Sequence, residues 1–177
     1  MKEIILGGGC FWCLEAAFQL LNGIHEVQSG YAGGTKETAN YSQVCSGKTG
    51  HAEVVKVTYN PDVISLDEIL RVFWHIHDPT TLNRQGNDVG PQYRSIIFYT
   101  SEEEKEVIEN SVTESAKPIW GSGIVTRIEK REIFYPAEKE HENYFQKVGD
   151  RNPYCTYVVK PKVIKVTEKF KDKLKNL

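Results

Sequence analysis

The sequence predicts one α+β domain in which helices pack on a mixed β-sheet. The first observation is the length, because 177 residues are enough for one buried core and too few for two comfortable ones. We therefore take 1–177 as a single domain, with 150–177 as its C-terminal segment. The second observation is the order of elements through residue 100, where apolar periodicity indicates strand, helix, strand, strand, helix and strand.

The first half of this order is read from residues 1–59. "KEIIL" is typical of a short buried strand, and the glycines behind it turn the chain. Apolar residues then recur at helical spacing from Phe11 to Leu21, until "NG" ends the helix. "IHEVQSGYAGG" predicts a second strand, and the polar residues 33–50 a loop. Apolar and polar residues alternate up to Tyr59, which predicts the third strand.

Capping signals place the helices of the second half. "SLDE" has the spacing of a capping box and predicts a helix that ends near His77. The turn-forming residues 78–94 follow, and then "SIIFYT" as the fourth strand. "SEEE" is a second capping box, and its polar helix is predicted to end near Pro118. A strand over 124–129 and a short helix over 137–147 complete the pattern, before a lysine-rich solvated helix or tail.

The order of the first six elements is that of the split βαβ units in ferredoxin-like folds. We therefore expect a ferredoxin-like core with a mixed sheet, helices packed on it, long loops and a C-terminal tail. The two long loops, 33–50 and 78–94, interrupt this core. Loops of that length inside a compact domain usually carry function.

Net charge and cysteine content limit the partners and the cellular compartment that we expect for this protein. The net charge of -2 gives no reason to expect nucleic acid or a membrane as partner. The N-terminus lacks the pattern of a secretory signal, and no segment is apolar for long enough to cross a bilayer. We expect a cytoplasmic monomer, and in a reducing compartment the four cysteines are more typical of catalysis or metal binding than of structural disulfides.

Two of these cysteines, Cys10 and Cys13, form a C-x-x-C motif at the predicted start of the first helix. Free backbone N–H groups and the helix dipole favour negative charge there, so we expect a lowered pKa for the Cys10 thiol. Cys13 lies one turn further in, where this field is weaker. The alternative is that both are ordinary small core residues.

Two other uses of the motif are weighed against the remaining residues. A zinc site needs about four ligands, but Cys45 and Cys155 stand alone, and His75 and His77 point to different faces of a helix. A thioredoxin-like disulfide fits the strand–motif–helix placement better. However, the bulky residues Phe11 and Trp12 between the two cysteines would keep the disulfide of another protein away from the thiol. They are better suited to contact a small apolar group next to a sulfur atom.

Polar residues elsewhere offer proton donors. Glu53 shares strand parity with Val55, so it points inward if that face is the core side. A buried carboxyl has a raised pKa and is able to act as a general acid, whereas a solvated Glu53 is the alternative. His51 has the same parity and is by itself more typical of a hydrogen-bonded structural residue. Tyr41 and Tyr93, in the long loops, are potential O–H donors or ordinary packing residues.

Several motifs together resemble one family, the peptide methionine sulfoxide reductases of the A type. The matching segments run from about Leu6 to Cys155 and are, in order, "GGCFWCLE", "GYAGG", "YSQVCSGKTGHAE", "HDPTTLNRQGNDVGPQYRS" and "NPYC". The resemblance implies reduction of methionine S-sulfoxide, in proteins and possibly free, without a metal or organic cofactor. A redox-responsive binding module that captures oxidised methionine without turnover is the main alternative, with a thioredoxin-like oxidoreductase third.

The resemblance also implies roles for individual residues. It makes Cys10 the nucleophile that becomes a sulfenic acid and Glu53 the acid that protonates the sulfoxide oxygen. It also implies that the hydroxyls of Tyr41 and Tyr93 hold this oxygen. The substrate-binding residues would be Phe11, Trp12, Asp88 and His51.

A second thiol would then close a disulfide that thioredoxin, or dithiothreitol in the test tube, reduces. Cys155 matches the family's resolving cysteine in a mobile C-terminal tail, and Cys13 is the alternative. We favour Cys155, because chain ends move more easily than helix turns. Cys45 is taken as structural.

Overall fold

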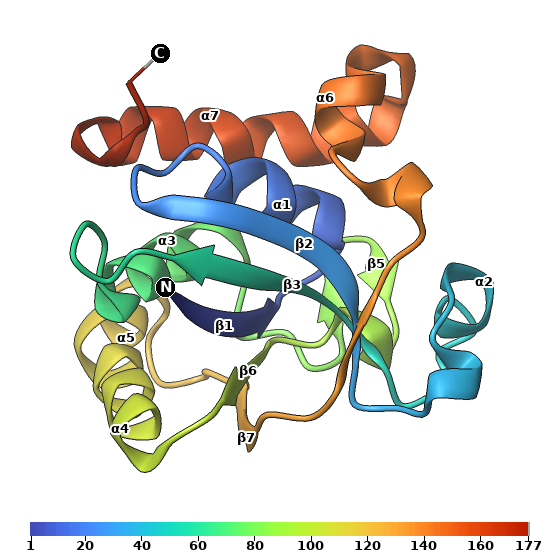
Figure 1. Cartoon of the computed structure of the whole chain (residues 1–177), viewed down its shortest axis with the longest axis horizontal. Helices are drawn as coiled ribbons and strands as arrows, with labels where there is room; N and C mark the ends of the chain where they lie inside the picture. Colours follow the sequence, from blue (N-terminus) through green and yellow to red (C-terminus); the bar gives the residue numbers. More distant parts are fainter. Residues whose placement is uncertain (177) are drawn as a thin grey trace.

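A computed structural model describes residues 1–176 and shows a six-stranded mixed sheet with helices packed on it (Figure 1). The sheet has the order β7-β6-β1-β3-β2-β8, and a two-stranded hairpin, β4-β5, lies outside it. The strand bounds are β1 Lys2–Gly7, β2 Ile24–Ala32, β3 Ala52–Tyr59, β4 Arg84–Gln85, β5 Asp88–Val89, β6 Ile96–Tyr99, β7 Arg127–Lys130 and β8 Phe134–Pro136. The helix bounds are α1 Phe11–Phe18, α2 Tyr41–Val44, α3 Leu66–Ile76, α4 Glu102–Ser111, α5 Lys117–Trp120, α6 Tyr144–Val148 and α7 Lys160–Lys169.

The predicted α+β class and the ferredoxin-like core are confirmed. The four central strands are all antiparallel to their neighbours in the order β6-β1-β3-β2, which two split βαβ units produce. The parallel pair β6-β7 makes the sheet mixed. The predicted capping box of α3 is present, since Ser65 accepts from the Glu68 backbone and the Glu68 side chain accepts from Ser65.

The main core lies between one face of the sheet and the helices α1, α3 and α7. Val55 and Val57 of β3 face this core, together with Leu14 and Phe18 of α1. The opposite face of the sheet has a smaller apolar cluster, over which Phe134 packs. Because Glu53 has the parity of Val55, it points toward α1, as the sequence predicted.

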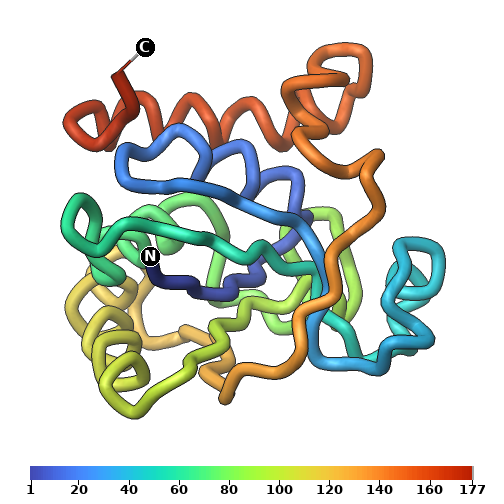
Figure 2. Tube along the Cα trace, in the orientation of Figure 1, coloured from blue at the N-terminus to red at the C-terminus, as the bar shows by residue number. Residues whose placement is uncertain are grey.

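Of the two forms predicted for the C-terminal segment, a solvated helix or a tail, the structure contains the helix, and one side of it is buried. Residues Lys160–Lys169 form α7, which lies along α1 (Figures 1 and 2). Val166 is buried, and so is Phe170 just after the helix. The many charged residues of this stretch made its narrow apolar stripe difficult to recognise in the sequence. A stripe of this kind is enough to hold a helix on the core.

Smaller corrections concern the loops and boundaries. The loop 33–50 contains the short helix α2, and 78–94 contains the β4-β5 hairpin. The predicted strand at 124–129 begins later, at Arg127, and β8 was not predicted. The predicted helix 137–147 is instead a 3-10 turn followed by α6.

Candidate active site

Cys10 lies at the N-cap of α1, directly after the glycine turn that ends β1. Gly9 has a φ of 91°, a backbone conformation that glycine adopts without strain. A Cβ at Gly9 would also lie 2.6 Å from Cγ of Gln85 in the β4-β5 hairpin. Glycine therefore lets the hairpin close over the turn that aims Cys10.

Glu53 lies beside Cys10. Its Oε1 accepts a hydrogen bond of 3.2 Å from the backbone N–H of Phe11, the first residue of α1. The side chain is 1% exposed, and this burial is the main reason that the pKa of Glu53 is raised to about 8. The carboxyl therefore holds a proton at neutral pH, as the sequence predicted for a buried acid.

The expected lowering of the Cys10 pKa is wrong. Burial raises the pKa of the Cys10 thiol well above its ordinary value, and the nearby acidic groups of Glu53 and Cys13 raise it further. The backbone N–H of Trp12 acts in the opposite direction. Desolvation thus outweighs the helix terminus, and Cys10 rests as a thiol.

Tyr41 and Tyr93 come from the two long loops and meet near these groups. Burial raises the pKa of both phenols, and the nearby acidic groups of Cys45, Glu53 and Cys10 raise it further. Both tyrosines therefore remain protonated and available as O–H donors. Both also hydrogen-bond the thiol of Cys45, which lowers its pKa, although burial raises that pKa overall.

Aromatic rings line the space next to Cys10. Phe11 is fully buried, and Trp12 is half-buried and stacks on Tyr144 with ring centroids 3.8 Å apart and an interplanar angle of 6°. The indole N–H of Trp12 donates to Nδ1 of His141 at 3.1 Å. Tyr41 lies 6.4 Å from the Trp12 ring. These rings form an apolar wall with a few polar edges.

Asp88 of β5 and Tyr154 connect the β4-β5 hairpin to the C-terminal segment that contains Cys155. Oδ2 of Asp88 accepts a hydrogen bond of 2.5 Å from the hydroxyl of Tyr154. Tyr154 also hydrogen-bonds Cys13, whose pKa is raised chiefly by burial. Cys155 is 0% exposed and begins a single π-helical turn that packs against α1. The expectation that it sits in a mobile tail is therefore wrong.

His51 is buried two residues before Glu53. Its Nδ1 accepts from the Gly34 backbone at 3.1 Å, and its Nε2 pairs with the Thr35 carbonyl at 2.8 Å. Both ring nitrogens thus hold the loop after β2, as the sequence predicted for a hydrogen-bonded structural residue.

Four site residues were not predicted from the sequence: Tyr31, Glu138, His141 and Tyr144. Glu138 accepts from the Tyr31 hydroxyl at 2.9 Å and from the Tyr41 backbone at 3.0 Å, so it fixes the loop that carries Tyr41. The segment "EKEHENYF" gave no helical signal for this pair, because the chain turns at Asn143, with a φ of 54°, between His141 and Tyr144.

One group of side chains within residues 1–176 is close enough to share a metal ion, namely Glu138, Glu140 and His141. It contains no cysteine. Two of its members already form hydrogen bonds, Glu138 with Tyr31 and His141 with Trp12. Within the same residues, no helix combines the length and the apolar character needed to span a bilayer.

Comparisons with known proteins match this chain over nearly its whole length. The family model described as peptide methionine sulfoxide reductase matches residues 2–174. A peptide methionine sulfoxide reductase MsrA from Nautilia profundicola is 54% identical over 165 residues, which cover 93% of this chain and 94% of the relative. The corresponding MsrA from Chromobacterium violaceum is 48% identical and covers 99% of this chain and 100% of the relative.

Solved structures agree with the sequence matches. Reduced Mxr1 from Saccharomyces cerevisiae superimposes with a TM-score of 0.76 and 42% identity, covering 86% of each chain. Mxr1 in complex with Trx2 superimposes with a TM-score of 0.55 and 34% identity, covering 81% of this chain and 84% of Mxr1.

Proposed function

This chain belongs to the peptide methionine sulfoxide reductase family, whose members reduce methionine sulfoxide, and from that premise we propose that the Cys10 sulfur takes the oxygen of a methionine S-sulfoxide. One observation carries the proposal. The protonated carboxyl of Glu53 is hydrogen-bonded to the first turn of the helix that Cys10 caps, so an acid and a thiol lie together at the start of α1.

The apolar wall explains how a methyl sulfoxide is held. Half-buried Trp12 offers its ring to the S-methyl group, and aromatic rings make favourable contacts with such groups. Fully buried Phe11 supports this wall by packing on Tyr41 and His141. The hydroxyls of Tyr41 and Tyr93 and the acid of Glu53 donate to the sulfoxide oxygen. We keep Asp88 as a residue that acts on the substrate pocket through Tyr154.

The oxygen transfer balances without an outside reactant. The Cys10 sulfur forms a bond to oxygen, the sulfur–oxygen bond of the substrate breaks, and two electrons pass from Cys10 to the methionine sulfur. Glu53 gives its proton to the oxygen and recovers one from the thiol. The products are methionine and a Cys10 sulfenic acid. Each well-placed donor to the developing oxyanion contributes about 3 kcal/mol to lowering the barrier.

A second thiol completes the cycle. It condenses with the sulfenic acid, water leaves, and a disulfide remains. We propose Cys155 for this step, with Cys13 as the alternative partner. Thioredoxin then returns two electrons, a step supported by the complex of the yeast relative Mxr1 with Trx2. Because thiols supply every electron, the scheme uses no metal or organic cofactor, and its free cysteines fit a cytoplasmic location.

The test is turnover of a short peptide that contains methionine S-sulfoxide, with dithiothreitol as reductant. The parent protein is expected to release methionine peptide, and Cys10→Ser to release none. The R epimer serves as the matched substrate and is expected to remain unreduced. Turnover by Cys10→Ser contradicts the proposal, and stoichiometric capture of the peptide without reduction supports a binding module instead.

A further inference from the structure

Gln92, the residue directly before Tyr93, joins the two long loops of the site. Its side chain is 4% exposed, although it lies in the turn-forming stretch 78–94. Nε2 of Gln92 donates a hydrogen bond of 3.2 Å to the backbone carbonyl of Cys45, which is the C-cap of α2. One buried amide group therefore connects the loop that carries Tyr93 to the helix that begins with Tyr41.

The space around this amide is shaped by two glycines. A Cβ at Gly90 would overlap Oε1 of Gln92, and a Cβ at Gly47 would lie 3.3 Å from the same oxygen. Within residues 1–176, this oxygen is buried without a hydrogen-bond partner. Burial of an unpaired oxygen destabilises the fold, which favours a functional use of Gln92 over a purely stabilising one.

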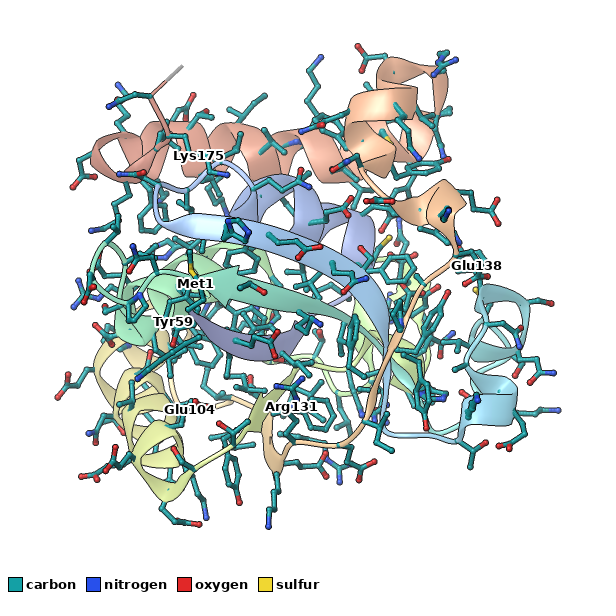
Figure 3. All side chains as sticks on the ribbon, in the orientation of Figure 1. Met1, Tyr59, Glu104, Arg131, Glu138 and Lys175 are labelled. Atoms are coloured by element: carbon teal, nitrogen blue, oxygen red, sulfur yellow. The ribbon has the colours of Figure 1, made fainter. Side chains whose placement is uncertain are left out.

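The helix α2 depends on side chains from other segments. It has four residues, of which Val44 is the buried one, and isolated helices of this length do not form in water. At its N-terminal end, the carboxylate of Glu138 accepts from the Tyr41 backbone at 3.0 Å. Figure 3 shows Glu138 on the side of the molecule where α2 projects from the sheet. Gln92 holds the opposite end, so both ends of α2 are fixed.

A second contact fixes the other side of Tyr93. The guanidinium of Arg94 donates to the Gly50 carbonyl at 3.0 Å, at the end of the loop 33–50. Tyr93 thus lies between two residues that each hydrogen-bond the loop of the other tyrosine. The bond from Gln92 is the one that reaches α2 itself, so it sets where the Tyr93 segment lies relative to that helix.

We propose that Gln92 is a positioning residue that sets the place of the Tyr93 hydroxyl relative to the Tyr41 hydroxyl. The inference rests on the proposed function, in which both hydroxyls donate to the sulfoxide oxygen. Both also hydrogen-bond one small group, the thiol of Cys45, so they lie close enough to meet on one atom. A donor to a developing oxyanion is effective only in the correct position, and a displacement of about 1 Å can lower a rate about 10²-fold.

The test variant is Gln92→Met, which has a similar length but no donor for the Cys45 carbonyl. The measurement is the rate of methionine release in a single turnover with a saturating S-sulfoxide peptide. We expect this rate to fall about tenfold or more, because the Tyr93 hydroxyl loses its alignment. The peptide concentration that gives half of the maximal rate is expected to change less than about twofold, since the aromatic wall is intact. An unchanged rate overturns the proposal.

A double-mutant cycle decides whether Gln92 acts through Tyr93. Tyr93→Phe has no hydroxyl to align, so adding Gln92→Met is expected to lower its rate by less than about twofold. Tyr41→Phe still has the Tyr93 hydroxyl, and there the same addition is expected to lower the rate about fivefold or more. An equal cost in the parent and in both phenylalanine variants contradicts the proposal, because Gln92 would then act on the whole site.

Ser111→Ala is the matched control for lost stability, since it also removes one buried hydrogen bond, the one that the Trp74 indole donates at 2.9 Å. We expect it to lower the urea midpoint about as much as Gln92→Met does and to leave the single-turnover rate unchanged. A similar loss of rate in both variants would assign the effect of Gln92→Met to stability and overturn the proposal. Failure of the parent protein to release methionine contradicts the Cys10 scheme itself.

Discussion

The backbone N–H of Phe11 donates to the Glu53 carboxyl at 3.2 Å, and this contact joins the first turn of α1 to the central strand β3. The hydrogen bond orients one carboxyl oxygen toward the helix. The other oxygen remains available for a proton. The acid and the thiol of Cys10 are thus placed by the two most deeply buried elements of the fold, and not by mobile loops.

The first prediction follows from the protonation of Glu53. With a pKa of about 8, the carboxyl is a proton donor below that pH and a carboxylate above it, so activity is expected to fall as pH rises through 8. Glu53→Gln retains a hydrogen-bond donor but has no proton to transfer, and we expect kcat to fall about 10²-fold or more. The measurement is the pH profile of kcat with a sulfoxide peptide.

The control for this prediction is Glu106→Gln, at an exposed position on α4. It is expected to keep the parent rate and the parent profile. A Glu53→Gln variant that keeps the falling limb near pH 8 assigns that limb to another group and removes Glu53 from the role of acid.

The second prediction concerns the stacking of Tyr144 on Trp12. Aromatic stacking contributes about 0.5–1.5 kcal/mol beyond burial, so Tyr144→Ala is expected to raise KM by about 3–10-fold with little change in kcat. Tyr144→Phe keeps the ring and should recover most of the loss, although it removes the hydrogen bond from Asn152. Tyr157→Ala, at a 79% exposed ring, is the control. A fall in kcat with unchanged KM would contradict a binding role.

The sequence predicted the core of this fold because its signals are local. The capping box before α3, the alternation in β3 and the glycine turn before Cys10 each lie within a few residues. The inward position of Glu53 was also predictable, since strand parity alone decides it. β8 was missed because three residues are too few to show alternation.

The other corrections involve contacts between distant segments. Tyr144 stacks on Trp12 although the two residues are 132 positions apart in the sequence (144 − 12 = 132). No local sequence pattern predicts such a contact. The raised pKa of Cys10 follows from burial beneath those segments, which outweighs the local effect of the helix terminus. Cys155 has the expected position in the sequence, but its packing against α1 was hidden by the polar residues around it.

The third prediction addresses the resolving thiol. Cys155 lies in the first turns of a helix that runs on without a break into α7 and that follows the short 3-10 segment Gly149–Arg151, and the end of a helix opens more readily than its middle. We therefore expect one equivalent of substrate to produce a Cys10–Cys155 disulfide, detected by mass mapping of peptides. Cys155→Ser is expected to slow disulfide formation at least tenfold while the first release of methionine stays fast.

Cys13→Ser is the matched variant for this experiment and is expected to form the disulfide at the parent rate. A Cys10–Cys13 bond that forms in the parent protein, or at an unchanged rate in Cys155→Ser, assigns the step to Cys13. That pair needs little rearrangement, because the Cys13 backbone N–H already bonds the Cys10 carbonyl at 3.1 Å.

The last prediction concerns Glu15, a second buried acid on α1. It is 1% exposed, and burial raises its pKa to about 7, while the backbone N–H groups of Asn143 and Tyr144 act in the opposite direction. Between pH 4.5 and 7 the folded state therefore binds more protons than the unfolded state. The free energy of unfolding must fall as pH rises through this window, by at most about 3 kcal/mol for this one group.

Glu15→Gln removes this titration and retains the shape of the side chain. We expect the difference in unfolding free energy, variant minus parent, to increase by about 1–3 kcal/mol between pH 5 and pH 8, as measured by urea denaturation. Comparing the two proteins at each pH cancels the titration of Glu53, which is present in both. Glu106→Gln is expected to differ from the parent by the same amount at both pH values. Parallel stabilities of Glu15→Gln and the parent would show that Glu15 is already ionised in the folded protein at pH 5, and its burial would then be compensated by the N–H groups of residues 143–144.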